Sequence, residues 1–191
     1  MSVTAFSFPT NIQFGAGARR LVAAHLREAG YQRPLLVTDK ALATLPVLDE
    51  FKTHLEDLDV AVFSGVFGNP TTSQVMAGAV AFIGHRADCI IGFGGGAALD
   101  VAKLVGVAAT HTGDIIEYVW DHPQSRAIEH SLPYLVTLPT TAGTGSEVGR
   151  ASVISEDDSH LKRVVFHPKL LAKCVFADPE LTLSLPPHIT A

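Results

Sequence analysis

A strand, a run of glycines and a helix are expected to follow one another without a break between residues 88 and 107. An apolar run ends in Gly94, Gly95 and Gly96, and a helical pattern of apolar residues starts at Ala97. Glycine lets the chain turn sharply and lets a ligand approach the main chain without meeting a Cβ. The first turn of a helix presents unpaired N–H groups and a partial positive charge. The segment therefore predicts a helix N-terminus that can hold a phosphate or pyrophosphate.

Two standard phosphate motifs do not describe this turn well. Residues 92–97 formally satisfy G-x-G-x-x-A, but the acidic residue expected about twenty positions later would be Glu117, which lies in no clear strand. No Gly-Lys-Ser/Thr follows the glycines, so the Walker pattern fails as well. The alternative is a tight turn with no ligand. We favour phosphate binding, because a glycine triplet at a strand–helix junction exceeds what packing needs.

Strands and amphipathic helices are expected to alternate as far as Glu147. Apolar runs predict strands at 35–38, 60–66, 89–93 and 134–138, after an edge strand at 1–14 that is broken at Pro9. Helical spacing predicts helices at 18–29, 47–58, 73–84 and 97–104, and a short one at 113–120. Hydroxyls at 71 and 72 are placed to cap the third of these helices. Such alternation is typical of an α/β fold with a mostly parallel sheet flanked by helices.

The pattern changes after Glu147. Residues 151–154 and 163–167 flank a polar turn, which predicts a β-hairpin appended to the sheet. A last strand is expected at 174–177, followed by a connector at 181–187. A length of 191 residues suits one domain, so residues 1–191 are expected to form a single α/β domain.

Bulk properties exclude several classes of protein. The formal charge of −5 and the lack of any Lys/Arg run argue against nucleic-acid binding. No apolar stretch suggests a membrane span or a signal peptide, so a cytoplasmic protein is expected. Cys89 and Cys174 lie in separate apolar runs and are expected to be reduced core thiols. The nine histidines form no metal-binding motif.

Two further segments are expected at the same edge of the sheet as the glycine turn. Asp39 ends a strand, where a carboxylate can accept both hydroxyls of an adenosine ribose and repel a 2′-phosphate. The alternative for Asp39 is a helix cap or a solvated turn residue. The loop at 139–147 is rich in hydroxyls that can bind phosphate, ribose or amide groups, or else satisfy its own backbone. Facing the glycine turn, the two segments predict a nucleotide cleft.

Together these residues resemble the iron-containing (group III) alcohol dehydrogenase family, and specifically its N-terminal nucleotide-binding domain. The matching segments occur in order across nearly the whole chain: FGAG (14–17), TDK (38–40), NPT (69–71), GFGGGAALDVAK (92–103), LPTTAGTGSEV (138–148) and FADPELTLSLPP (176–187). The resemblance implies the dehydroquinate synthase-like fold, in which an α/β nucleotide domain precedes an all-helical domain.

The resemblance also implies cofactor contacts. The pyrophosphate site would comprise Gly94, Gly95, Gly96, Ala97, Ala98, Leu99 and Asp100. Asp39 is similar to the family's ribose-binding acid, which implies NAD in preference to NADP. Asn69 resembles another cofactor contact. Thr140, Thr141 and Thr144 resemble the nicotinamide-side loop, and Lys162 and Leu181 match further contact positions.

Two departures weaken individual contacts. Ala97 replaces the serine that is commonest after the glycines, which removes a hydroxyl from the phosphate site. Ala151 stands where some members use Asn.

Asp100 and Lys103 share a helix face, where Asp100 also suits the helix dipole. Lys162 taken alone would be a solvated charge.

The resemblance implies a divalent metal, Fe²⁺ or another, held by an Asp and three His that would follow Ala191. The chain is therefore expected to lack the metal ligands and the helical domain. The implied activity is hydride transfer between NAD and an alcohol or aldehyde, with this chain supplying the cofactor half and a homodimer as the expected assembly. The alternatives are a nucleotide-binding module without catalysis, a maleylacetate-reductase-like enzyme and, less well matched, a lyase of the dehydroquinate-synthase type.

Overall fold

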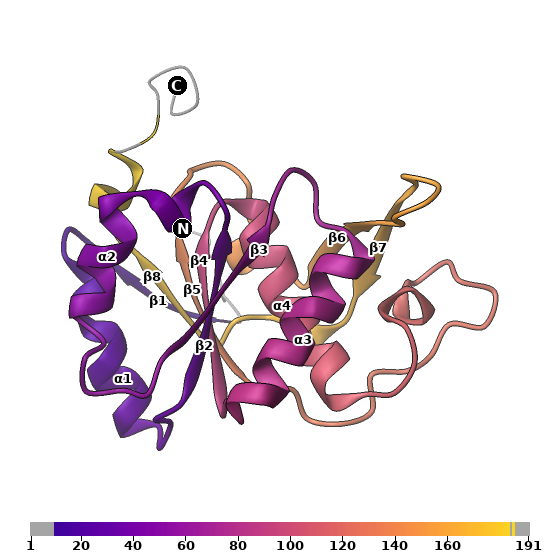
Figure 1. Cartoon of the computed structure of the whole chain (residues 1–191), viewed down its shortest axis with the longest axis horizontal. Coiled ribbons are helices and arrows are strands. Elements are labelled where there is room, and N and C mark those ends of the chain that lie inside the picture. The colour runs from indigo at the N-terminus through magenta and orange to yellow at the C-terminus, as the bar shows by residue number, and fades with distance from the viewer. Residues whose placement is uncertain (1–9, 184, 186–191) are drawn as a thin grey trace, which may run out of the picture.

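Six parallel strands form the central sheet, in the order β1-β8-β5-β4-β2-β3 (Figure 1). The computed structural model describes residues 10–183 and 185. The strands are β1 Asn11–Phe14, β2 Pro34–Asp39, β3 Ala61–Val66, β4 Cys89–Gly94, β5 Tyr134–Pro139 and β8 Cys174–Ala177. The predicted parallel sheet is therefore confirmed. The expectations for residues 1–9 and 186–191 lie outside the described part.

Helices cover both faces of this sheet (Figure 1). On one face lie α1 (Val22–Glu28) and α2 (Pro46–Thr53), and on the other lie α3 (Thr72–His85) and α4 (Gly96–Thr110). Each face has its own apolar cluster. Every residue of β4 is buried, which explains its uninterrupted apolar run, since a strand covered on both faces shows no alternation.

Two predicted helices differ in extent from those observed. The helix expected at 18–29 is a 3-10 turn at Ala18–Leu21 followed by α1. The helix expected at 47–58 ends at Thr53. Leu55 and Leu58 are nevertheless buried in the turn that follows. The apolar pattern therefore extends beyond the end of the helix, which is why the predicted helix was too long. The predicted cap of α3 is confirmed, because the Thr71 side chain accepts the Gln74 N–H.

The predicted hairpin is confirmed as β6 (Ala151–Ser155) and β7 (Lys162–Phe166), which form a separate two-stranded sheet. It packs beside α4, with Ile154 and Val165 fully buried (Figure 1). The short helix expected at 113–120 is a 3-10 turn, Ile115–Tyr118, in which Glu117 completes a capping box. Glu117 therefore lies in a 3-10 turn and not at the end of a strand, where the acidic residue of a G-x-G-x-x-G/A motif would be expected.

The direction of chain progression reverses at β2. The chain steps from β2 outward to β3, then returns past β2 to place β4 on its other side. The helices of these connections therefore lie on opposite faces, and a crevice opens between the carboxyl ends of β2 and β4. Asp39 ends β2 and Gly94 ends β4, so both lie at this crevice. Both cysteines are buried and free, as expected. No helix among the described residues has the length and apolarity that crossing a membrane requires.

A buried ion pair joins the 3-10 turn that follows β1 to the segment that follows β8. Arg19 Nη1 donates to Asp178 Oδ2 over 2.6 Å, and the Arg19 backbone N–H donates to the same oxygen over 3.2 Å. Asp178 is only 2% exposed. Burial raises the pKa of Asp178, but hydrogen bonds from Arg19 and from backbone N–H groups outweigh it, so the pKa lies below its usual range.

We expect Asp178→Asn to lower the free energy of unfolding by about 2 kcal/mol at pH 7, because Arg19 loses a buried charged partner while keeping Glu50 and Glu180. The matched control is Asp57→Asn. Asp57 pairs with Arg27, and these side chains are 70% and 45% exposed. The control should therefore cost less than about 1 kcal/mol. Urea unfolding measures both, and equal losses would contradict the assignment.

The same carboxylate predicts a pH dependence. Because the pKa of Asp178 is depressed in the folded state, its contribution is complete above the unfolded value of about 3.9. The contribution is lost as the pH falls through the lower folded pKa. The unfolding free energy of Asp178→Asn should therefore fall less steeply than that of the parent below about pH 4. Parallel acid-unfolding curves for the two proteins would contradict this.

Candidate functional site

Three segments far apart in the chain meet at the carboxyl edge of the sheet. A Cβ built on Gly94 would lie 3.4 Å from Asp39 Oδ2. The N–H of Thr140, which follows β5, donates to the Gly94 carbonyl over 3.0 Å. The strand ends of β2, β4 and β5 thus form one site, as the parallel order predicts.

The N-terminus of α4 offers backbone donors at this site. Gly95 is the N-cap and accepts the Leu99 N–H over 3.1 Å, but no side chain caps the helix. The first N–H groups of a helix have no acceptor within it. With no side-chain cap, the amides of Gly96, Ala97 and Ala98 are available to an anion, and the helix dipole adds a partial positive charge.

Space explains the glycines in this turn. Gly94 has φ +147°, and a Cβ there would lie 2.8 Å from the Ala98 Cβ, closer than real Cβ atoms approach. A Cβ on Gly96 would lie 3.2 Å from the Thr144 Cβ. A Cβ on Gly95 would meet only Thr141 Oγ1, at the ordinary distance of 3.5 Å. Folding therefore requires glycine at 94, whereas glycine at 95 keeps open the space in front of the turn.

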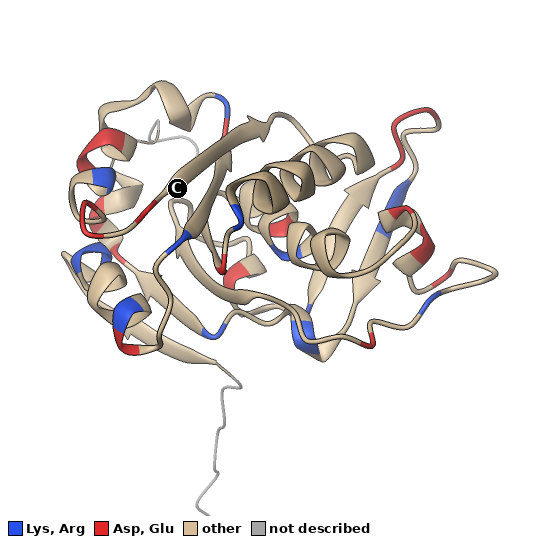
Figure 2. Cartoon of the chain, turned by 60° about the horizontal axis from the view of Figure 1, so that its bottom comes forward, with Lys and Arg blue, Asp and Glu red and all other residues tan. Residues whose placement is uncertain are grey.

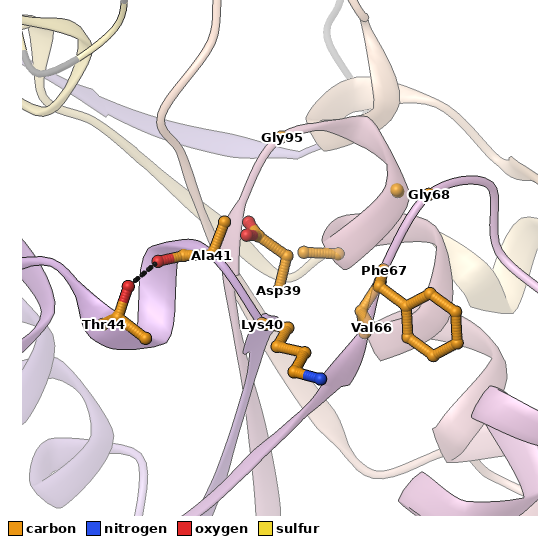
Figure 3. Close-up of a pocket in the computed structure, with 10 residues that line it drawn as sticks. Asp39, Lys40, Ala41, Thr44, Val66, Phe67, Gly68 and Gly95 are labelled. Atoms are coloured by element: carbon orange, nitrogen blue, oxygen red, sulfur yellow. Dashed lines mark hydrogen bonds between the residues drawn. The ribbon is translucent and has the colours of Figure 1, made fainter.

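A pocket of about 470 Å³ opens beside the turn (Figure 3). Figure 3 shows the Asp39 carboxylate directed toward the glycine turn and the Lys40 side chain directed away from it. Asp39 Oδ1 accepts the N–H of Leu42, the first residue of the 3-10 turn Leu42–Thr44, over 2.8 Å. The other oxygen, Oδ2, faces Gly94. Asp39 therefore combines a local backbone contact with a position beside the pocket.

A second pocket, of about 330 Å³, lies beside the loop that follows β5. Thr141 and Glu147 line it from the loop after β5, and Phe14 and Thr182 line it from the ends of β1 and β8. Thr141 is also the residue nearest to Gly95. Thr141 therefore connects the second pocket to the glycine turn.

The other predicted cofactor residues occupy different positions. Ala97 and Ala98 line the first pocket, whereas Leu99 is fully buried in the core. The Asp100 carboxylate accepts hydrogen bonds from the Val153 N–H (3.0 Å) and the Ser146 hydroxyl (2.5 Å), and Asp100 lines neither pocket. Leu181 is 1% exposed, in the core beneath the second pocket's rim. Direct contacts from these three residues stay predictions.

The remaining predicted residues lie on the loops around the site. Thr140 is buried and Thr144 is exposed above Gly96. Asn69 is exposed in the turn after β3, next to Gly68 of the first pocket. Lys162 is exposed at the start of β7, opposite Ser155. The Ser155 N–H donates to the Pro70 carbonyl, so strand β6 lies between Lys162 and the turn that carries Asn69.

Several residues of the first pocket were not predicted individually. They share a position directly after the carboxyl ends of β2 and β3: Lys40, Ala41, Thr44, Val66, Phe67 and Gly68. The sequence does contain a signal for them: the carboxyl ends of parallel strands meet at one edge of the sheet, so the residues near those ends can be expected at the site. In Figure 2 the basic and acidic residues are interspersed along the elements.

No group of three or more His, Cys, Asp or Glu side chains among residues 10–183 and 185 is placed to hold a metal ion. The expectation that the metal ligands lie outside this chain stays a prediction.

Comparison with known proteins identifies close relatives. The family model "Iron-containing alcohol dehydrogenase" matches residues 9–179. The chain is 35% identical to choline dehydrogenase of Bacillus subtilis, over 97% of this chain and 46% of that protein. It is 37% identical to 4-hydroxybutyrate dehydrogenase of Cupriavidus necator, over 95% and 47% respectively. The chain thus spans about half the length of these curated relatives.

Solved structures agree with this comparison. A 1,3-propanediol oxidoreductase, 33% identical, superposes with a TM-score of 0.89 over 98% of this chain and 49% of that one. A sulfoacetaldehyde reductase from Bifidobacterium kashiwanohense, solved in complex with NAD⁺, is 26% identical with a TM-score of 0.89, over 99% and 50% respectively. The predicted fold class, with its dehydroquinate synthase-like N-terminal domain, is confirmed by these neighbours.

We expect Gly94→Ala to destabilise the protein by roughly 1–3 kcal/mol more than Gly143→Ala, because only the first change forces a Cβ against Ala98. Gly143 also has positive φ, at +93°, but nothing lies within 4 Å of its Cβ position. The pair therefore separates backbone strain from crowding. Chemical denaturation checks this, and equal losses would show that crowding at Gly94 is relieved elsewhere.

Proposed function

The chain belongs to the iron-containing alcohol dehydrogenase family, and from this premise we propose that it supplies the NAD-binding half of a metal-dependent oxidoreductase acting on alcohols and aldehydes. One observation carries the proposal: the uncapped N-terminus of α4 lies at the crevice between β2 and β4, with Asp39 beside it. A helix N-terminus suits a pyrophosphate, and a strand-end carboxylate suits a ribose.

The shape of the site fits a dinucleotide. NAD consists of two nucleosides joined by a pyrophosphate. The uncapped end of α4 contributes Ala97 and Ala98 to one pocket, and Thr141, beside Gly95, lines a second. The glycine turn lacks side chains where the pyrophosphate would lie, and the amides of Gly96, Ala97 and Ala98 at the uncapped helix end would donate to it. The relative solved with NAD⁺ supports the choice of cofactor.

Each residue has a defined part in this proposal. The backbone of Gly94, Gly95 and Gly96 with Ala97 and Ala98 holds the pyrophosphate. Asp39 accepts hydrogen bonds from the adenosine ribose hydroxyls. Hydroxyls of Thr140, Thr141 and Thr144 close the cleft from the β5 side. Asn69 and Lys162 approach it from the β3 side, and Leu181 supports the wall of the second pocket.

The cofactor and metal supply the chemistry that these residues position. When bound, the nicotinamide exchanges a hydride with the substrate, and a divalent metal polarises the substrate oxygen. This chain's own contribution is to bind, orient and shield the cofactor. We propose that the metal ligands belong to a further part of the family's polypeptide, that this chain alone binds cofactor without turnover, and that the protein forms homodimers.

Other functions have weaker support. The names of the relatives range from choline to 4-hydroxybutyrate and 1,3-propanediol dehydrogenases, so the proposal names only the alcohol or aldehyde class. A solved maleylacetate reductase from Agrobacterium tumefaciens is 24% identical with a TM-score of 0.76, which shows a shared fold alone. No observation favours that reaction over the dehydrogenase reaction.

The first test is NADH binding to the chain itself. We expect NADH to bind with a change in its fluorescence, and Gly95→Ala to raise the Kd at least about tenfold, because the new methyl group enters the phosphate space. The free energy of unfolding of Gly95→Ala should differ from that of the unmutated chain by less than about 1 kcal/mol, since the protein leaves room for that Cβ. The control for binding is Gly84→Ala in α3, where a new Cβ would have no atom within 4 Å, and its Kd for NADH should be unchanged. Absence of NADH binding by the unmutated chain would refute the proposal.

The second test concerns cofactor preference. Asp39→Asn keeps an oxygen to accept the Leu42 N–H but removes the charge that repels a 2′-phosphate. We expect the unmutated chain to prefer NADH over NADPH, and the variant to narrow this preference by about tenfold or more, since bonds to charged groups contribute about 1.5–3 kcal/mol. Competition titrations measure both constants. Equal affinity of the unmutated chain for the two cofactors would rule out this role for Asp39.

A further inference from the structure

A buried lysine lies behind the glycine turn. Lys103, on α4, is only 1% exposed. Its Nζ donates to Ser146 Oγ over 3.1 Å and to the Ala151 carbonyl over 2.9 Å, and lies 3.7 Å from Asp100 Oδ1. Burial lowers the pKa of Lys103, and the nearby carboxylates of Asp100 and Glu147 oppose that shift. A charge removed from water in this way needs specific partners, and Lys103 has three.

Ser146 connects Lys103 to Asp100. Its hydroxyl donates to Asp100 Oδ1 over 2.5 Å while accepting from Lys103. Both functions of one hydroxyl are therefore used, and its orientation is determined. Charge-assisted hydrogen bonds of this kind are stronger than neutral ones. Ser146 is thus the best-anchored side chain of the loop that follows β5.

This anchor determines where the loop lies. The loop is attached near its start by the Thr140 N–H on the Gly94 carbonyl, and near its end by Ser146 on α4. Between the two attachments, Thr141 lies against Gly95 and Thr144 against Gly96. Gly143 and Gly145 both have positive φ, so the intervening backbone is intrinsically permissive. The position of the two threonines therefore depends on the two attachments.

The Asp100 carboxylate is occupied by the protein on both oxygens. Oδ2 accepts the Val153 N–H over 3.0 Å, and Oδ1 accepts Ser146. The Asp100 backbone carbonyl also accepts the Ser152 hydroxyl over 3.2 Å. A carboxylate would in addition repel a pyrophosphate. These contacts favour an indirect role over the direct contact that the resemblance implies.

We propose that Asp100 and Lys103 are positioning residues that act through Ser146, holding the loop at 140–146 over the glycine turn so that the cleft is formed before the cofactor binds. The inference rests on the proposed NAD-binding function for its consequence, but the loop anchor itself is independent of it. A cleft formed in advance spares the cost of ordering the loop on binding.

Ser146→Ala tests this directly, because it removes the connecting hydroxyl while leaving Lys103 and Asp100 close enough to pair. We expect backbone amides of residues 141–146 to exchange with deuterium faster in the ligand-free chain, and the Kd for NADH to rise about tenfold. The melting temperature should fall by no more than about 4 °C. Ser146→Thr, which restores a hydroxyl, should recover both properties in part.

The matched control is Ser152→Ala. Ser152 is fully buried and also bonds to α4, but it lies outside the loop. Its loss should lower the melting temperature without changing loop exchange or the Kd. Unchanged loop exchange in Ser146→Ala would overturn the inference, and so would faster exchange with an unchanged Kd. If the unmutated chain fails to bind NADH, the proposed function fails, while exchange of the ligand-free loop still decides whether the anchor exists.

Discussion

The arrangement of the sheet's carboxyl edge depends on one constraint, the uncapped N-terminus of α4. A helix end without a side-chain cap requires another partner for its N–H groups, and here it also follows directly on a buried strand. The change of direction between β4 and α4 takes place within Gly94 and Gly95, because no other residue fits the φ and the space at Gly94. Asp39 and the loop after β5 are then packed against this turn, so the requirement of one helix end shapes three connections.

Electrostatics at this edge differ from those of a basic anion site. The chain has a formal charge of −5, and its charges are interspersed (Figure 2). An anionic guest would be held by fixed amide dipoles, and full charges of both signs lie nearby: Asp39 and Lys40 line the first pocket, and Lys103 Nζ lies 3.7 Å from Asp100 Oδ1. Each carboxylate is restrained by the protein: Asp39 by the Leu42 N–H, and Asp100 by Ser146 and Val153. Under the proposed function, a fixed Asp39 carboxylate would accept ribose hydroxyls and repel a 2′-phosphate, whereas both carboxylate oxygens of Asp100 are already bonded to the protein.

The sequence predicts the parts of this fold that depend on local pattern. The strand–glycine–helix segment, the parallel order and the position of Asp39 follow from residues adjacent in the chain. The end of α2 does not, because Leu55 and Leu58 keep helical spacing while lying in a turn. The surroundings of Asp100 are also invisible from the sequence, since Ser146 and Val153 lie 46 and 53 residues away. Patterns identify which face of an element is buried, whereas the partner of a polar side chain depends on tertiary structure.

The hairpin shares its anchors with the loop. The Ala151 carbonyl accepts from Lys103 and the Val153 N–H donates to Asp100, the two side chains that also hold Ser146. Strand β6 cannot slide along α4 without disturbing the bonds that keep Thr141 and Thr144 above the glycines. The hairpin and the loop therefore cannot be repositioned independently, because the same two side chains of α4 bond to both.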